Sequence, residues 1–163
     1  MISIENISAD TAETLCRQLT NLLPEYFGLP KANEHYALGV RLKTNFAAKM
    51  KEDYIGLISL NFPYENNGNI YWMAIHPKFH NLGIGSKLIQ RAVTFAYQQG
   101  AITLTVETLA PSESDKNYLK TYYFYLKQSF SPLFNLKPQG HEGNMVYMVK
   151  TVEMANLNNL ISS

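Results

Sequence analysis

The spacing of hydrophobic residues divides the chain into helical and strand-like segments. Residues 8–23 carry leucines at helical spacing, which predicts a helix with Ser8 or Asp10 as its cap and Pro24 after its end. Residues 24–38 are interrupted by two prolines and a glycine. We expect loops with short helical pieces there, because both residue types break regular structure.

Three strand-like runs follow, at residues 45–50, 54–62 and 70–77. A turn at residues 51–53 joins the first two, and PYENNGN joins the second and third with an Asn-Gly pair that is typical of a hairpin. Residues 84–98 have one apolar face and predict an amphipathic helix that ends at Gly100. Residues 101–107 then alternate as a strand does, so this strand–helix–strand run predicts a parallel βαβ unit.

The last third of the chain predicts one more helix and two short strands. Residues 111–128 are helical in pattern, and Ser112 with Asp115 three residues later resembles a capping box. Residues 130–136 and 145–150 are strand-like. Neither a repeat nor a linker divides the chain, so we expect one domain, residues 1–152, and a C-terminal tail, residues 153–163.

Composition excludes several function classes. The 163 residues carry a net charge of +1, which gives no electrostatic reason to expect nucleic acid or an anionic membrane as partner. There is neither an apolar run of about 20 residues nor a basic N-terminal region, so neither a membrane span nor a secretory signal is expected. Cys16 is the single cysteine, and a reducing, cytoplasmic location fits. The four histidines show no ligand spacing, so no metal is expected.

The stretch HNLGIGSKL, residues 80–88, is the first candidate for chemistry. Two glycines stand where a strand passes into a helix, and the first amides of a helix bind anions. The sequence is neither a P-loop nor a Rossmann fingerprint. Taken alone, it fits a phosphate-binding loop and an ordinary glycine turn that opens a helix equally well.

The order of the motifs resembles that of the GNAT acetyltransferases. The pyrophosphate loop of that family, [RQ]-x-x-G-x-[GA], here reads His80 to Gly85, with both glycines matched and the first position different. Downstream, Tyr125 and Phe130 match the family pattern, while Ser129 replaces its usual glycine and Asn117 stands one place early. The resemblance covers residues 45–150. It implies a mixed α/β (α+β) fold: a central, mixed but mostly antiparallel twisted sheet, flanked by helices, with strands splayed at the coenzyme A site.

The resemblance also implies an activity: acetyl-CoA-dependent N-acetylation of a primary amine by direct attack. The pantetheine arm would pair with the strand backbone before the loop, and the pyrophosphate would lie on the loop amides. Lys87, in the first helical turn, would compensate for the weaker charge of His80, unless it is simply a solvated residue. The residues expected to hold coenzyme A are Met73, Ala74, Ile75, His80, Asn81, Leu82, Gly83, Ile84, Gly85, Ser86, Lys87, Asn117 and Tyr125.

Tyr125 matches the family position that protonates the leaving thiolate, although a buried aromatic would fit the same helix. The base that deprotonates the amine is open between Glu107, at a strand end, and His76. A solvated strand-end residue, a surface histidine and a water chain are the alternatives.

The acceptor is expected to be a small-molecule amine or a protein amino group. An aromatic, mildly acidic pocket would suit it, with Tyr26, Phe27, Tyr36 and Tyr64 as wall residues, although these also fit core and turn positions. The main rival function is a non-catalytic acyl-CoA-binding or regulatory domain of the same fold. A third hypothesis is that YYFYLKQSFSPLF, residues 122–134, forms a subunit contact of a homodimer, because exposed aromatic clusters are typical of interfaces.

Overall fold

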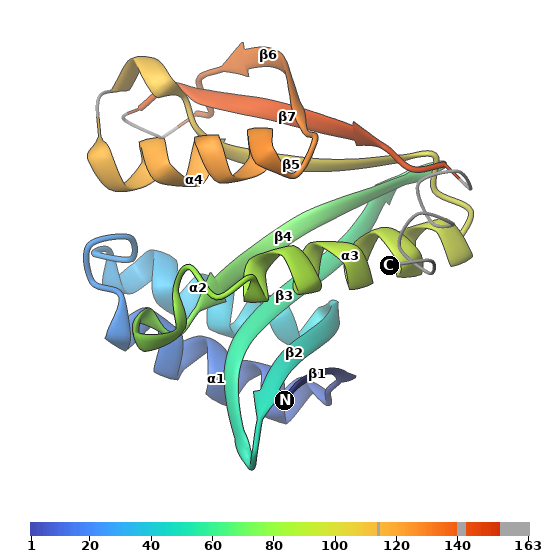
Figure 1. Ribbon diagram of the computed structural model, residues 1–163. Helices are drawn as coiled ribbons and strands as arrows, with labels where there is room; N and C mark the ends of the chain where they lie inside the picture. Colours follow the sequence, from blue (N-terminus) through green and yellow to red (C-terminus); the bar gives the residue numbers. More distant parts are fainter. Residues whose placement is uncertain (114, 140–142, 154–163) are drawn as a thin grey trace. The chain divides into compact units, whose positions relative to one another are not determined.

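The computed structural model describes residues 1–113, 115–139 and 143–153 (Figure 1). Within them the chain forms four α-helices and seven strands that belong to one sheet, which confirms the mixed α/β fold. The helices are α1 (Ala9–Leu22), α2 (Pro30–Gly39), α3 (Ile84–Gln98) and α4 (Lys116–Lys127). The strands are β1 (Ile2–Asn6), β2 (Thr44–Met50), β3 (Asp53–Tyr64), β4 (Asn67–Ile75), β5 (Thr103–Leu109), β6 (Ser131–Leu136) and β7 (Met145–Thr151).

The strands pair in the order β1-β2-β3-β4-β5-β7-β6. The pairs β1–β2, β2–β3, β5–β7 and β6–β7 are antiparallel, as expected for a mostly antiparallel sheet. Chain contacts divide the protein into two compact units, which we call the N-terminal unit (Met1–Asn61 and Ile70–Phe95) and the C-terminal unit (Phe62–Asn69 and Ala96–Ser163). The predicted tail lies outside the described residues except for Glu153. None of the helices in the described part of the chain has the length and apolarity needed to cross a membrane.

The N-terminal unit has helices on both faces of its strands. On one face, α1 and α2 pack on Ala47, Leu57 and Ala74 in a buried cluster. On the other, Leu88 of α3 lies over Gly56, where an added Cβ would be 3.3 Å from it. Adjacent strand residues point to opposite faces, so the continuous buried runs of β2 and β3 show that these strands are covered on both sides, whereas β4 alternates between buried and half-buried residues.

The C-terminal unit has one covered and one open face. Along β5 and β7 the residues of one phase, Val106, Thr108, Val146 and Met148, are buried. Helix α4 lies along this part of the sheet (Figure 1), and Lys150 of the same phase donates from Nζ to the Gln128 carbonyl at the end of α4 (2.8 Å). The opposite phase, which includes Glu107, is more exposed.

Two elements at the N-terminal end were not predicted. β1 was missed, because a five-residue edge strand carries too short a pattern to be recognised; it is specified by its pairing with β2. Residues 30–39 form a continuous helix, α2, where short pieces were expected. Pro30 stands at its first position, where a proline costs no hydrogen bond, and Arg17 of α1 holds it through Glu34 (Nη2–Oε1 3.0 Å).

Two local predictions, the position of the β3–β4 turn and the cap of α4, were wrong by a few residues. The β3–β4 turn is formed by Glu65 and Asn66, with Asn66 at φ 57°, so the Asn67–Gly68 pair lies inside β4. The cap of α4 is Asp115 itself, whose Oδ1 accepts from the amides of Asn117 and Tyr118 (2.9 and 3.1 Å), and not Ser112. At the turn the left-handed backbone of Asn66 decides the position, and at α4 the Asp115 side chain that accepts from the backbone does.

The end of α4 explains the spacing of Tyr125, Ser129 and Phe130. The Phe130 amide donates to the Tyr125 carbonyl (3.0 Å), and the Ser129 amide donates to that of Leu126 (3.1 Å), which is the Schellman pattern. Ser129 has φ 68°, the left-handed conformation that favours glycine. The rings of Tyr125 and Phe130 meet edge to face with centroids 5.4 Å apart, as the hydrophobic contact of this motif requires.

We predict that Ser129→Gly stabilises the protein. The left-handed conformation costs an L-residue roughly 1–2 kcal/mol. Glycine avoids this cost, but it loses more conformational entropy on folding, which reduces the gain by roughly 0.5–1 kcal/mol. The free energy of unfolding, measured in urea, should rise by about 0.5–1 kcal/mol. The control Lys127→Gly, inside the helix, should lower it by about 1 kcal/mol. A decrease for Ser129→Gly would show that the left-handed turn is not strained.

Candidate functional site

The glycine loop joins β4 to α3 through two residues with left-handed backbone, Asn81 (φ 63°) and Gly83 (φ 78°). The Gly83 carbonyl accepts the first helical bond of α3 from the Lys87 amide (3.2 Å), so Gly83 is the residue from which α3 starts. Gly85 is the second residue of α3 and has helical backbone. The two glycines therefore differ: Gly83 is required by the turn, while Gly85 leaves bare backbone on the first turn of the helix.

This geometry fits an anion. The first amides of α3, at Ile84, Gly85 and Ser86, precede the first intrahelical bond and lie at the positive end of a 15-residue helix. A Cβ placed on Gly83 would meet nothing within 4 Å, so there is open space beside the loop. Ile84 is 1% exposed and fixes the helix start on the sheet, while Leu82 and Gly83 face solvent. Diphosphate oxygens are suited to such a row of amides.

His80 is turned back onto the end of β4. Its Nε2 lies 2.8 Å from the Ile75 carbonyl oxygen. Because a carbonyl only accepts, Nε2 carries the proton, and Nδ1 is an acceptor in the neutral ring. His80 thus closes the loop of residues 75–80 instead of offering a charge to a ligand. That backbone amides hold the anion with little help from the side chain at position 80 stays a prediction.

The residues of β4 alternate between buried and half-buried up to the loop. Trp72 and Ala74 belong to the cluster under α1 and α2, and Tyr71, although adjacent to Trp72, packs against the same cluster. Ile75 lies on the α3 side, 3.5 Å from a Cβ built on Gly56.

An aromatic group collects around Tyr71 and Trp72 in the N-terminal unit. Phe27 lies 5.2 Å from Trp72 and 6.4 Å from Tyr26, and Tyr36 lies 5.4 Å from Tyr71, between ring centroids. Burial, together with the neighbouring Tyr36 and Cys16, raises the pKa of Tyr71. The structure thus brings together three of the four predicted wall residues. The fourth, Tyr64, belongs to the C-terminal unit and is 74% exposed.

His76 lines a separate cavity of about 740 Å³ in the N-terminal unit. The end of α1, the β2–β3 turn and the segment after β4 enclose it, with Tyr54 and Phe79 among its walls. His76 Nδ1 accepts from the Lys78 amide (3.1 Å), and its ring stands edge-on to Phe79 (5.2 Å). A neutral His76 therefore carries its proton on Nε2.

Tyr125 is fully enclosed in the C-terminal unit, with 5% of its surface exposed. Its ring meets those of Phe124 and Phe130 edge to face. This burial raises the pKa of the phenol far above its ordinary value, so the hydroxyl stays protonated at every physiological pH. Asn117, by contrast, lies in the first turn of α4, where its amide donates to the Asp115 cap.

Glu107 is the exposed residue of β5 and lies opposite Tyr147 of β7. Tyr147 in turn lies opposite Phe134 of β6, and their rings are stacked at 5.5 Å and 20°. Burial raises the pKa of Tyr147, and the Glu107 carboxylate adds to the rise. Sequence reasoning missed Tyr147, and it named Phe134 only as the end of the aromatic stretch that it interpreted as a subunit contact. Strand alternation alone would have placed Tyr147 on one face, but its neighbours depend on the register of three strands.

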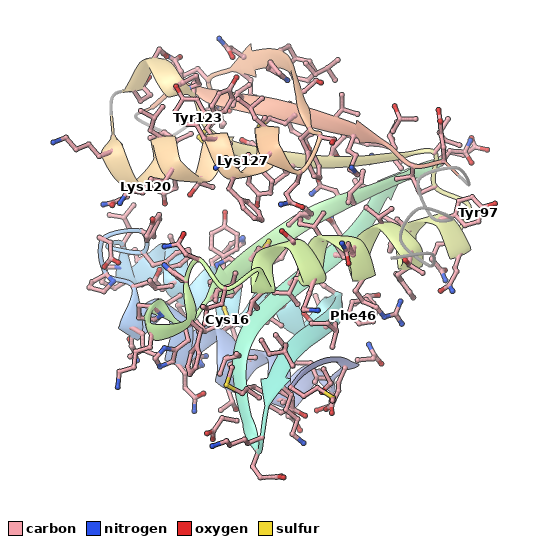
Figure 2. All side chains as sticks on the ribbon, in the orientation of Figure 1. Cys16, Phe46, Tyr97, Lys120, Tyr123 and Lys127 are labelled. Carbon is pink, nitrogen blue, oxygen red and sulfur yellow. The ribbon has the colours of Figure 1, made fainter. Side chains whose placement is uncertain are left out.

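The remaining residues singled out in the sequence are Lys87, the possible metal ligands and Cys16. The Lys87 side chain is exposed in the first turn of α3, and its amide closes the first helical bond. No group of three or more His, Cys, Asp or Glu side chains is placed to hold a metal ion in the part of the chain that the structure describes. Cys16 is buried, and burial raises the pKa of its thiol to about 12 (Figure 2).

Comparison with known families assigns the chain. The profile of the Acetyltransferase (GNAT) family matches residues 12–121, which run from α1 into α4 and include the glycine loop. The chain belongs to the GNAT acetyltransferase family. By sequence, no curated protein matches it.

Solved structures of this family share the fold of this GNAT protein at low sequence identity. A GNAT-family protein from Desulfovibrio desulfuricans aligns with a TM-score of 0.80 and 18% identity, covering 94% of this chain and 100% of its own. The ribosomal-protein-S18-alanine N-acetyltransferase from Escherichia coli aligns with a TM-score of 0.74 and 14% identity, over 94% and 96%. An aminoglycoside 6'-N-acetyltransferase in complex with coenzyme A aligns with a TM-score of 0.70 and 16% identity, over 93% and 97%.

We predict that His80→Ala loosens the glycine loop of this GNAT protein and that His80→Gln does not. Removing the bond to the Ile75 carbonyl should cost about 1 kcal/mol locally, and a glutamine amide can reach the same acceptor. Hydrogen exchange of the Lys78 and Phe79 amides, which bond within this turn, should accelerate in His80→Ala alone. Equal exchange in wild type and His80→Ala would contradict a tie from His80 to β4.

Proposed function

We propose that the protein is an acetyl-CoA-dependent N-acetyltransferase that transfers an acetyl group to a primary amine by direct attack. The observation that carries this proposal is the start of α3: backbone amides that precede the first intrahelical bond, a left-handed Gly83 and open space beside it, at the end of β4 in a GNAT chain. The coenzyme A in the aminoglycoside acetyltransferase structure is consistent with it.

The loop and β4 would share the binding of the cosubstrate. The amides of Asn81 to Ser86 would hold the pyrophosphate, and the exposed ammonium of Lys87 would add charge at the same helical turn. Along β4, the Met73 and Ala74 backbone would pair with the pantetheine arm, because one acceptor position of the Ile75 carbonyl is already used by His80. Bound there, acetyl-CoA supplies an activated acyl group whose C–S bond breaks as the new N–C bond forms.

Two proton transfers would accompany the reaction. Tyr125 would give its proton to the departing thiolate, a role that rests on its family position and on the burial that keeps the phenol protonated. Glu107 or His76 would accept the proton from the ammonium before attack. Glu107 is an exposed carboxylate on a strand, whereas His76 faces its own cavity and has only Nε2 left after the bond from Lys78.

The acceptor would be a small-molecule amine or a protein amino group. Structural neighbours include acetyltransferases named for an aminoglycoside and for a ribosomal-protein alanine, so the fold alone does not choose between them. We assign Tyr26, Phe27, Tyr36 and Tyr64 to the acceptor side, the first three as one aromatic group. We also propose a cytoplasmic location, in keeping with the single, unbridged cysteine.

A non-catalytic acyl-CoA-binding domain is the second candidate. One argument for it is that Ser129 replaces a glycine of the family pattern, and the conformation of Ser129 weakens that argument. Ser129 departs from the family glycine, yet it adopts the left-handed conformation that the Schellman turn needs. Ser129 therefore leaves Tyr125 positioned on the turn as a glycine would. The two candidates differ in thiol release: a binding domain would be stabilised by acetyl-CoA and release none with any amine.

Gly83→Val should weaken acetyl-CoA binding at least ten-fold. A β-branched side chain is strained at φ 78° and would fill the space beside the loop amides. Gly100→Val is the matched control, since Gly100 has φ 84° and equally open surroundings at the α3–β5 turn. Affinity is measured by calorimetry and stability by melting. An equal loss of affinity in both variants would assign the effect to folding and remove the loop from the site.

Tyr125→Phe should retain acetyl-CoA affinity and lose about 10²-fold or more in kcat, the usual contribution of a general acid. The ring packing on Phe130 is kept in this variant, so the fold should not change. Tyr123→Phe, on the same helix but 53% exposed, is the control (Figure 2). Thiol release is followed with a disulfide reagent, to which the buried Cys16 does not respond in the native state. Unchanged turnover in Tyr125→Phe would exclude the acid role.

A further inference from the structure

The cavity of about 740 Å³ that His76 lines lies within the N-terminal unit, next to the segment that leads into the glycine loop. One of its walls is that segment, residues 76–79, which joins β4 to the loop. All of its lining residues belong to the same unit as β4 and the loop, so the packing of one unit fixes their positions relative to one another. A volume of this size matches a drug-sized ligand and exceeds that of a simple amine.

The inner part of the cavity is apolar. Four of the lining residues are apolar or aromatic and are buried or half-buried: Met50, Tyr54, Ile55 and Phe79. We call these four residues the cavity floor. Apolar side chains that face a cavity gain free energy when a ligand removes their surface from water. The floor therefore suits an apolar side chain of a ligand.

The charges of the lining cancel. Lys51 and Asp53, at the β2–β3 turn, contribute one charge of each sign. Both are exposed, and neither forms an ion pair with a residue that the structure describes. The cavity thus offers one ammonium and one carboxylate to a ligand, and no excess of either sign.

The other polar lining groups are neutral. Gln18 and Asn21 lie three residues apart at the end of α1, and each side-chain amide both donates and accepts. His76 Nδ1 accepts from the Lys78 amide (3.1 Å), so the neutral ring has Nε2–H left as a donor. A peptide chain carries a carbonyl and an N–H at almost every residue, and it matches such a mixed set of donors and acceptors.

This lining distinguishes between the classes of acceptor. A polyamine or an aminoglycoside brings several ammonium groups, and these would meet a single carboxylate, Asp53, with the ammonium of Lys51 close by in sequence. A small monoamine would leave most of the floor uncovered. A peptide can cover the floor with one apolar side chain, bond the neutral polar groups and place an acidic side chain at Lys51.

We propose that the acceptor is an amino group of a peptide or protein chain, and that the cavity binds the residues next to that amino group. This proposal rests on the proposed N-acetyltransferase function. The amine nitrogen attacks the acyl carbon of acetyl-CoA, the N–C bond forms, and the C–S bond breaks. The amine loses one proton and the released thiol gains one.

The position of the cavity along β4 sets the length of peptide that reaches it. Met73 and Ala74, which we assign to the pantetheine arm, precede His76 by two or three residues, or about 7–10 Å at the rise of a strand. An extended peptide spans at most about 3.3–3.6 Å per residue. Its first two or three residues therefore connect the thioester to the cavity, and the following residues occupy the cavity.

The first test is thiol release with acetyl-CoA and peptides of different length. The substrates are alanine amide, dialanine amide and a pool of pentapeptide amides that begin with two alanines and have three randomised positions. The pool should give a kcat/KM at least about ten-fold above those of the two short amides, ethylamine, spermidine and kanamycin, through contacts with the floor and Lys51. A second pool, with an acetylated N-terminus and one lysine, distinguishes a side-chain amine from a chain terminus.

Two variants test the cavity separately from the reaction. Met50→Ala should raise the apparent KM for the active pool about five-fold and change kcat less than about two-fold, because only a binding contact is lost. Lys51→Glu should shift the preference from acidic to basic members of the pool about five-fold, the upper end for an exposed ion pair. The KM for ethylamine, which does not reach the cavity, should not change. Lys31→Glu, exposed on α2 and outside the cavity, is the matched control and should alter neither pool nor ethylamine.

Binding of the pools is also measured without acetyl-CoA, from shifts of the Lys51, Asp53 and Phe79 amide resonances. Shifts without thiol release from any amine would overturn the enzymatic function and leave the cavity as a peptide site. Thiol release with spermidine or kanamycin, but no shifts and no turnover with either pool, would overturn the peptide acceptor and leave the enzymatic function standing. Turnover of a pool that neither Met50→Ala nor Lys51→Glu affects would also overturn the proposal, because the peptide would then bind elsewhere.

Discussion

The start of α3 depends on a left-handed turn of the backbone at Gly83, and the arrangement of the N-terminal unit follows from it. The turn lets the chain leave β4 and enter a helix that has one apolar face. Ile84 and Leu88 then anchor the helix over Gly56, which has no side chain to keep them away. Buried side chains and backbone amides thus have separate roles at one helix end: the side chains hold the helix in place, and the amides point out of its start.

The fold could be predicted from the sequence wherever a pattern repeats over several turns or residues. α1, α3 and the β2–β4 meander have such patterns, and their ends fell within a few residues of the observed ones. β1, α2 and the β3–β4 turn could not be predicted in the same way. β1 exists through pairing with β2, α2 through its contacts with α1, and the turn through the left-handed Asn66. Each of these is decided by a neighbour or by backbone torsion, neither of which is encoded in local hydrophobicity.

The candidate site shows the same division. The glycine loop and the Tyr125–Phe130 pair were predicted from the match of their order and spacing to the GNAT pattern, and the Schellman turn at the end of α4 gives the physical reason for the interval between Tyr125 and Phe130. The tie from His80 to the Ile75 carbonyl and the row from Glu107 to Phe134 were not found, because they depend on rotamers and strand register. The aromatic residues likewise divide by environment: those beside Trp72 join a core, while Phe134 and Tyr147 meet solvent.

The buried thiol of Cys16 has a consequence for a protein that would release a thiol at every turnover. Cys16 is enclosed in the N-terminal core, and burial raises the pKa of its thiol to about 12. Attack on a disulfide requires a thiolate with access to it, and this chain offers neither. Oxidised forms of coenzyme A would therefore find no partner for mixed-disulfide formation on the folded protein. A single, buried cysteine would therefore leave the folded protein unreactive toward disulfides of the thiol that the proposed reaction releases.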